Sequence, residues 1–219
     1  MKDIKSVIFD MDGVIFDTER LYLRCCVEVG DRLGLKDVEA VCKKCIGITS
    51  KVTDQIMRDS FGGNFEVDDY KGDVYKLFLN YFKDGKEYIK DGVIEILDYL
   101  KTNDYKVALA SSTKKEDVER ELRVAGLIDY FDEIVCGDMV SKSKPEPDIF
   151  LEAARRINTI PEECLVLEDS FNGIRAAYSA GMRAIMIPDL LEPDDEMREK
   201  AWKIVPTLVE AKQVIEETK

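Results

Sequence analysis

Short apolar segments recur along the chain in the manner of buried strands in a parallel sheet. Each spans four to six residues and is rich in valine, isoleucine, leucine or alanine, which favours a strand over a helix. Between them lie stretches whose apolar residues are three or four positions apart, the spacing of an amphipathic helix. From about residue 90 onward the two kinds of segment alternate, which predicts a doubly wound α/β fold. The predicted strands are 5–10, 105–110, 133–136, 164–167 and 183–187, with helices near 93–100, 118–125 and 149–157.

Residues 17–88 interrupt this alternation, because they show helical spacing and no clear strand. Leu21, Cys25 and Val29 recur at every fourth position, and a second apolar stripe follows over residues 74–82. We therefore predict an all-helical module inserted directly after the first strand. The predicted domains are a discontinuous α/β core of residues 1–16 and 89–219 and a helical domain of residues 17–88.

The charge of the chain limits the partners that it can attract. Forty-five acidic residues outweigh 32 basic ones, which gives a net charge of −13, and no basic stripe offsets the acidic background. Nucleic acid and anionic membranes are therefore not expected as partners. A phosphate ester can approach such a protein only where a metal ion or a few lysines make the site locally positive. The acidic stretch 192–196 is predicted to be a solvated loop.

The apolar runs and the cysteines indicate in which cellular compartment the protein is expected. No run approaches the roughly 18 apolar residues of a membrane span, and Asp10 cuts the first apolar segment too early for a signal peptide. We therefore expect a cytoplasmic protein, a monomer or a weak homo-oligomer, whose six cysteines are reduced thiols. Cys42 and Cys45 form a CxxC pair, but their helical context favours packing thiols over redox or zinc chemistry.

The chain contains no histidine, and this narrows its chemistry. Ser-His-Asp hydrolysis, histidine phosphorylation and ordinary zinc sites are excluded, so that acid–base work falls mainly to carboxylates. Asp10 and Asp12 follow the first predicted strand directly, and Gly13 permits the tight turn that such a loop needs. The two aspartates are either a functional pair at the carboxyl edge of the sheet or solvated loop residues.

A second acidic pair, Glu168 and Asp169, ends another predicted strand. If the two strand ends share one edge of the sheet, four carboxylates converge there and require a counter-charge. Oxygen ligands without histidine, beside a phosphate, favour Mg²⁺ over zinc or copper. The sequence therefore predicts a magnesium site at this edge.

Hydroxyl groups and a lysine follow two further predicted strands. Ser111 and Ser112 could cradle a phosphate with their hydroxyls and backbone N–H groups, and they could equally cap the next helix. Lys144 lies in a turn stiffened by Pro145, where it is a candidate counter-charge for phosphate and for Asp10. The alternative for Lys144 is a solvated loop lysine.

Taken in order, the segments DMDGV, ALASST, SKPEPDIF and LEDSFNGI resemble the four sequence motifs of the haloacid dehalogenase superfamily. The helical insertion resembles the cap of the subgroup that contains β-phosphoglucomutases, phosphoglycolate phosphatases and sugar-phosphate phosphatases. The resemblance implies a Rossmann-like core, a helical cap and a small phosphorylated metabolite as the substrate.

The resemblance also implies a role for each motif residue. Asp10 corresponds to the nucleophile that becomes an aspartyl-phosphate, and Asp12 to the general acid and base whose backbone carbonyl touches the metal. Ser111, Ser112 and Lys144 correspond to the groups that hold the phosphoryl oxygens. The implied Mg²⁺ ligands are Asp10, Asp12, Glu168 and Asp169.

Three features of the motifs and the insertion bear on the reaction. Haloacid dehalogenases lack the second aspartate, so Asp12 favours phosphoryl transfer over dehalogenation. Tyr22 stands where β-phosphoglucomutases carry a cap-hinge histidine, and Ser50 or Lys51 stands near the position of their cap arginine. We therefore predict a magnesium-dependent phosphatase for a small phosphomonoester such as a sugar phosphate. The alternatives are a hexose-phosphate mutase and a non-catalytic binding protein on the same fold.

By the same resemblance, we expect the helical cap to supply specificity. The candidate residues lie at the start of the first helix of the insertion and in its middle loop, and the alternative is that they are helix surface and hinge only. They are Thr18, Glu19, Arg20, Gly47, Thr49, Ser50 and Lys51.

Overall fold

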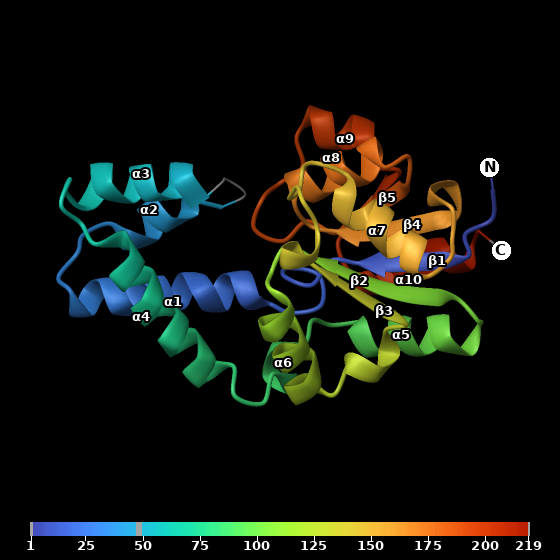
Figure 1. Cartoon of the computed structure of the whole chain (residues 1–219), viewed down its shortest axis with the longest axis horizontal. Coiled ribbons are helices and arrows are strands. Elements are labelled where there is room, and N and C mark those ends of the chain that lie inside the picture. The colour runs from blue at the N-terminus through green and yellow to red at the C-terminus, as the bar shows by residue number, and fades with distance from the viewer. Residues whose placement is uncertain (1, 47–49, 219) are drawn as a thin grey trace. The chain divides into compact units, whose positions relative to one another are not determined.

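The computed structural model describes residues 2–46 and 50–218, and it divides into two compact units. The first unit comprises Met1–Asp17 and Asp84–Lys219, and the second comprises Thr18–Lys83. The first unit is a parallel sheet with helices on both of its faces, and the described part of the second is helical (Figure 1). The predicted α/β fold class with a helical insertion is therefore confirmed.

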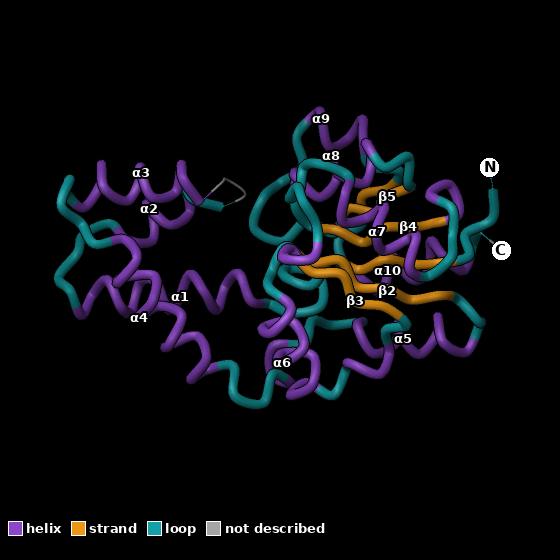
Figure 2. The backbone as a smooth tube through the Cα atoms, in the orientation of Figure 1, coloured by secondary structure: helices purple, strands orange, loops and turns teal. Residues whose placement is uncertain are grey.

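A six-stranded sheet forms the centre of the first unit (Figure 2). Its strand order is β3-β2-β1-β4-β5-β6, and every neighbouring pair is parallel. Five of the strands match the predicted apolar segments, whereas β6 has only two residues and therefore leaves no recognisable apolar run. The strands are β1 (Ser6–Phe9), β2 (Lys106–Ser111), β3 (Glu133–Cys136), β4 (Cys164–Glu168), β5 (Arg183–Met186) and β6 (Lys203–Ile204).

Helices cover the two faces of this sheet. In Figure 2, α7 and α8 lie on one face, and α5 and α6 lie on the other. The helices are α5 (Val93–Thr102), α6 (Lys115–Ala125), α7 (Asp148–Arg156), α8 (Phe171–Ser179), α9 (Asp195–Lys200) and α10 (Leu208–Glu216), with single 3₁₀ turns at Lys86–Tyr88, Ile128–Tyr130, Gly137–Met139 and Pro161–Glu163.

The acidic stretch 192–196, predicted to be a solvated loop, instead leads into helix α9. The Asp194 carboxylate caps the helix by accepting a hydrogen bond of 2.9 Å from the Met197 N–H. Met197 itself is fully buried and anchors the helix on the core. The acidic residues therefore mark a helix N-terminus, where negative charge is favourable.

The central strand β1 sets the level of the carboxyl edge. Its last residue, Phe9, lies opposite Leu109 of β2 and Leu167 of β4. Since both strand pairs are parallel, the next residue in each of the three strands lies at the same edge of the sheet. These residues are Asp10, Ala110 and Glu168.

The second unit contains α1 (Thr18–Arg32), α2 (Val38–Lys43), α3 (Ser50–Phe61) and α4 (Val67–Tyr81). Helices α1 and α4 pack together, and the Tyr70 hydroxyl donates a buried hydrogen bond of 2.7 Å to the Cys26 carbonyl. Cys26 and Cys42 are buried, and all six cysteines of the chain are free thiols. Among the described residues, no helix has the length and apolar content needed to cross a membrane.

The chain leaves the first unit and returns to it at one place. The Asp17 N–H donates to the Tyr88 carbonyl at 2.8 Å, and the Lys90 N–H donates to the Ile15 carbonyl at 2.9 Å. Residues 84–88, which we predicted to be part of the helical domain, therefore belong to the first unit. Their pairing with the outgoing chain, rather than helical periodicity, decides their place.

Candidate active site

The loop after β1 brings its backbone against the end of β4. Asp10 continues the ladder by donating its N–H to the Leu167 carbonyl at 2.9 Å. Gly13 has a positive φ of 78°, and a Cβ at this position would lie 2.1 Å from Asp169 Oδ2. Only glycine permits both the turn and this close approach.

Three buried carboxylates meet at the carboxyl edge. Asp10, Glu168 and Asp169 each offer one oxygen atom, and these atoms lie within 4.8 Å of one another. The donor set consists of oxygen atoms only and carries an excess of negative charge, so it fits a hard divalent cation such as Mg²⁺. The Asp12 carboxylate, which we predicted beside them, lies outside this cluster of described residues and instead accepts a hydrogen bond of 3.0 Å from Thr113 Oγ1.

Lys144 is buried between two of these carboxylates. Its Nζ atom lies 2.5 Å from Asp10 Oδ1 and 2.7 Å from Glu168 Oε1, and it donates to the Ala110 carbonyl at 3.2 Å. Only 6% of the Lys144 side chain is exposed. The lysine therefore contacts Asp10, Ala110 and Glu168, the residues that follow the aligned positions at the ends of β1, β2 and β4.

Glu168 is fixed through both of its oxygen atoms. While Oε1 contacts Lys144, Oε2 accepts a hydrogen bond of 2.7 Å from the Ser170 N–H. A Cβ on Gly173, in the first turn of α8, would lie 1.7 Å from Oε1. The start of α8 thus holds Glu168 in place, and Glu168 in turn orients Lys144.

Burial dominates the electrostatics of the site. It raises the pKa of Asp10 from 3.8 to about 8; Lys144 opposes this shift, whereas Glu168 and Asp12 add to it. Burial alone would lower the pKa of Lys144, but Asp10 and Glu168 raise it, so the lysine stays charged. A second acid, Glu121 of α6, has a pKa raised to about 8 by burial and then by Asp12, with Arg120 opposing.

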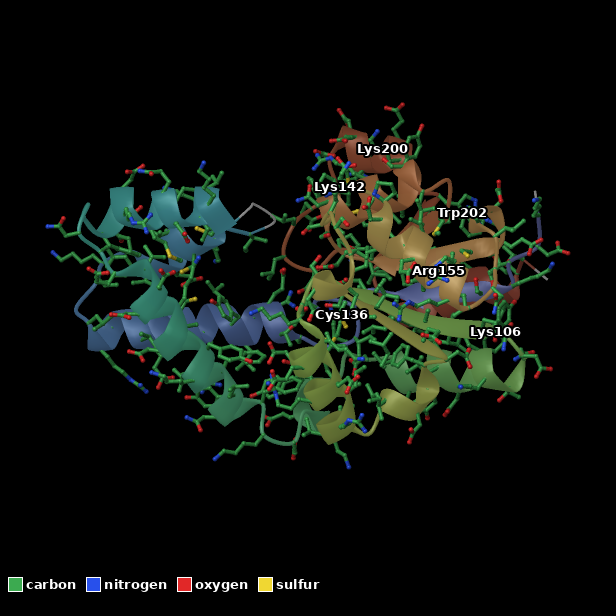
Figure 3. The ribbon with its side chains drawn as sticks, viewed as in Figure 1. Lys106, Cys136, Lys142, Arg155, Lys200 and Trp202 are labelled. Atoms are coloured by element: carbon green, nitrogen blue, oxygen red, sulfur yellow. The ribbon has the colours of Figure 1, made fainter. Side chains whose placement is uncertain are left out.

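The end of β2 supplies the hydroxyl groups. Ser111 is fully buried, and its Oγ accepts a hydrogen bond of 3.1 Å from the Thr113 N–H, whereas Ser112 is exposed. In Figure 3, Cys136 marks this carboxyl edge of the sheet and Lys106 marks the opposite amino edge. The two serines therefore differ in environment, and Thr113 connects Ser111 with Asp12.

Lys90 contacts the loop after β1, and the sequence alone did not predict this contact. Its Nζ donates to the Gly13 carbonyl at 2.6 Å and to Asp189 Oδ1 at 3.0 Å. The Asp189 side chain is 2% exposed. Lys90 thus ties the loop after β1 to the segment after β5, and nothing in its own sequence neighbourhood indicates this contact.

The predicted specificity residues belong to the helical unit. Thr18 is buried at the start of α1, followed there by Glu19 and Arg20. Ser50 is the first residue of α3, and Lys51 is exposed in that helix. Gly47 and Thr49 lie outside the described residues. Tyr22 lies in α1, with its ring centroid 6.5 Å from that of Phe78.

The first unit is a doubly wound sheet that carries a buried carboxylate cluster and a lysine at the carboxyl ends of its strands. This arrangement defines a class of α/β enzymes whose chemistry rests on acidic residues. Within this class, the chain belongs to the haloacid dehalogenase-like hydrolase family, which it matches over residues 7–187. It is therefore a hydrolase of that family.

Three known proteins illustrate the relationship. The chain is 35% identical over 184 residues to the phosphorylated carbohydrates phosphatase of Thermotoga maritima, with 83% of this chain and 84% of the relative covered. It resembles a crystal structure from Thermotoga maritima provisionally assigned as a β-phosphoglucomutase, with 32% identity, a TM-score of 0.82, and coverage of 98% and 99%. It also resembles a CbbY mutant from Rhodobacter sphaeroides in complex with xylulose-1,5-bisphosphate, with 26% identity, a TM-score of 0.76, and coverage of 94% and 96%.

Proposed function

We propose that this protein is a magnesium-dependent phosphatase that hydrolyses small phosphorylated carbohydrates through an aspartyl-phosphate on Asp10. The observation that carries the proposal is the contact of one buried lysine, Lys144, with both Asp10 and Glu168. A lysine in that place can neutralise a phosphoryl group as it is transferred to Asp10. Membership of the hydrolase family supports the same assignment.

The side chains of the site have complementary tasks in this reaction. As Asp10 attacks phosphorus, the bond to the leaving oxygen breaks, and Asp12 gives that oxygen its proton. In the second half, Asp12 takes a proton from the water that attacks the aspartyl-phosphate, and Asp10 is released. Ser111, the Ser112 backbone and Lys144 hold the phosphoryl oxygens throughout.

A divalent cation in this site would keep Asp10 ionised and neutralise the phosphoryl group. Burial raises the pKa of Asp10, and a protonated carboxyl group is a poor nucleophile. Asp10, Glu168 and Asp169 would hold Mg²⁺, and the Asp12 backbone carbonyl would be a further ligand. When bound, the ion supplies positive charge that favours ionised Asp10 and neutralises the phosphoryl oxygens.

The substrate class rests on the relatives. One is a phosphatase of phosphorylated carbohydrates, and another binds xylulose-1,5-bisphosphate. We therefore propose a sugar phosphate, bound with help from the cap residues Thr18, Glu19 and Arg20 and from the segment 47–51.

The test is a screen of phosphorylated metabolites in which released phosphate is measured with and without EDTA. We expect metal-dependent release by the wild type, loss of activity by a factor of at least about 10³ in Asp10→Asn, and full activity in the control Asp129→Asn, an exposed aspartate of the same unit. Full activity in Asp10→Asn, or release that EDTA does not affect, would sink the proposal.

A hexose-phosphate mutase is the second candidate, favoured by the likeness to a β-phosphoglucomutase from Clostridium difficile, with 25% identity and a TM-score of 0.78. Tyr22 at the position of the hinge histidine counts against it. Incubation with β-glucose 1-phosphate and a bisphosphate primer separates the two reactions. Glucose 6-phosphate as the product would establish the mutase, and free phosphate alone would exclude it.

A further inference from the structure

Thr113 connects the phosphate-binding end of β2 with the loop after β1. Its Oγ1 donates a hydrogen bond of 3.0 Å to Asp12 Oδ2, and its N–H donates one of 3.1 Å to Ser111 Oγ. Its carbonyl accepts a hydrogen bond of 3.1 Å from the Gly137 N–H. The backbone of Thr113 is therefore held on both sides, which fixes the position from which its hydroxyl reaches Asp12.

The frame around this loop is tight. A Cβ on Gly137, just beyond β3, would lie 2.2 Å from the Ser112 carbonyl oxygen, so the end of β3 packs directly on the backbone beside Thr113. Thr113 is half-buried, and its β-branched side chain restricts the hydroxyl to few rotamers. A hydrogen-bond donor on such a frame is preorganised for its acceptor.

We propose that Thr113 is the positioning residue for Asp12 and that its hydroxyl selects the Asp12 oxygen that transfers the proton. The inference rests on the proposed function, in which Asp12 is the general acid and base. The hydrogen bond from Thr113 makes the two carboxylate oxygens of Asp12 inequivalent, and the proposal assigns the transferred proton to Oδ1. A hydroxyl suits both halves of the reaction, since Oδ2 can accept its hydrogen bond whether or not Oδ1 is protonated.

The proton balance follows from this assignment. When the bond from Asp10 to phosphorus forms and the bond to the leaving oxygen breaks, the Oδ1 proton passes to the leaving oxygen. When water attacks phosphorus and the bond to Asp10 breaks, Oδ1 takes a proton from the water. Asp12 thereby returns to its starting state after one turnover.

The test compares leaving groups, because only protonation of the leaving oxygen depends on their basicity. Thr113→Val keeps the branched shape but removes the hydroxyl, and Thr113→Ser keeps the hydroxyl. The matched control is Thr102→Val, an exposed threonine of α5 whose hydroxyl donates to the Asp98 carbonyl. For each variant, kcat/KM is measured with phenyl phosphate and with p-nitrophenyl phosphate, whose leaving group is much less basic.

We expect Thr113→Val to lower kcat/KM roughly 10- to 100-fold for phenyl phosphate and less than about threefold for p-nitrophenyl phosphate. Thr113→Ser and Thr102→Val should stay within about threefold of wild type on both. Equal losses on both substrates would overturn the inference, because they would place Thr113 in phosphate binding through Ser111. Wild-type activity of Thr113→Val on both would overturn it as well.

Two controls keep the result interpretable. Circular dichroism and a thermal melt check the fold of Thr113→Val, and if it does not fold, Thr113→Ala takes its place in the same comparison with the same deciding outcomes. Failure of the proposed function itself looks different, since wild type would then release no metal-dependent phosphate or Asp10→Asn would remain active.

Discussion

At the scale of single residues, Glu121 is a buried acid that has no role in the proposed reaction. Its side chain is 4% exposed and is paired with the adjacent Arg120 at 3.0 Å. Burial, followed by the nearby charge of Asp12, raises its pKa from 4.5 to about 8. Between these two pH values the folded protein keeps a proton on Glu121 that the unfolded chain has lost. This group therefore makes the folded state less stable as the pH rises from about 4.5 to about 8.

Replacing Glu121 by glutamine should remove this dependence. We expect Glu121→Gln to match wild type near pH 4 and to exceed its free energy of unfolding by on the order of 3 kcal/mol at pH 8. Urea unfolding at a series of pH values measures the difference. The control Glu116→Gln, an exposed acid of the same helix, should follow the wild-type pH dependence. If Glu121→Gln also follows it, Glu121 is ionised in the folded protein.

At the scale of elements, the sequence predicted the strands far better than the contacts between their ends. Apolar runs identified β1 to β5, because a strand buried on both faces must be apolar along its length. The same reasoning placed the acidic pairs at one edge. It did not identify the Thr113–Asp12 bond, which joins residues 101 positions apart, or the contacts of Lys90. Such pairings depend on strand register and loop geometry, which no local pattern encodes.

The junction of β4 and α8 offers a direct test of the carboxylate arrangement. A methyl group at Gly173 would overlap Glu168, so Gly173→Ala should displace this carboxylate from Lys144. We expect phosphatase activity to fall at least about 10-fold and stability to fall by about 1–3 kcal/mol. Phosphate release and thermal unfolding measure the two effects.

Gly72 provides the matched glycine control. It lies inside α4, where an added Cβ meets no atom within 4 Å among the described residues. Gly72→Ala should therefore leave activity unchanged and stabilise the protein by about 0.5–1 kcal/mol through helix propensity. Wild-type activity in Gly173→Ala would mean that Glu168 has room to move without consequence.

At the scale of the whole molecule, the first unit is built from two separate stretches of chain that meet beside the site. The hydrogen bonds from Asp17 to Tyr88 and from Lys90 to Ile15 close this junction. We therefore predict that a chain in which residues 18–83 are replaced by a short Gly/Ser linker folds cooperatively. Hydrogen exchange should show protected amides in β1, β2 and β4, and a non-cooperative thermal transition would contradict the prediction.

The closed junction also has a consequence for how such a protein can change over generations. Since the outgoing and returning segments are joined by their own backbone, helices between them can be lengthened, exchanged or rebuilt without re-forming the loop that carries Asp12. If the helical unit supplies the substrate contacts, as we propose, selection for a new substrate and selection for the reaction itself act on different stretches of the gene. Grafting the helices of a relative between residues 17 and 84 is accordingly a rational way to redirect this enzyme.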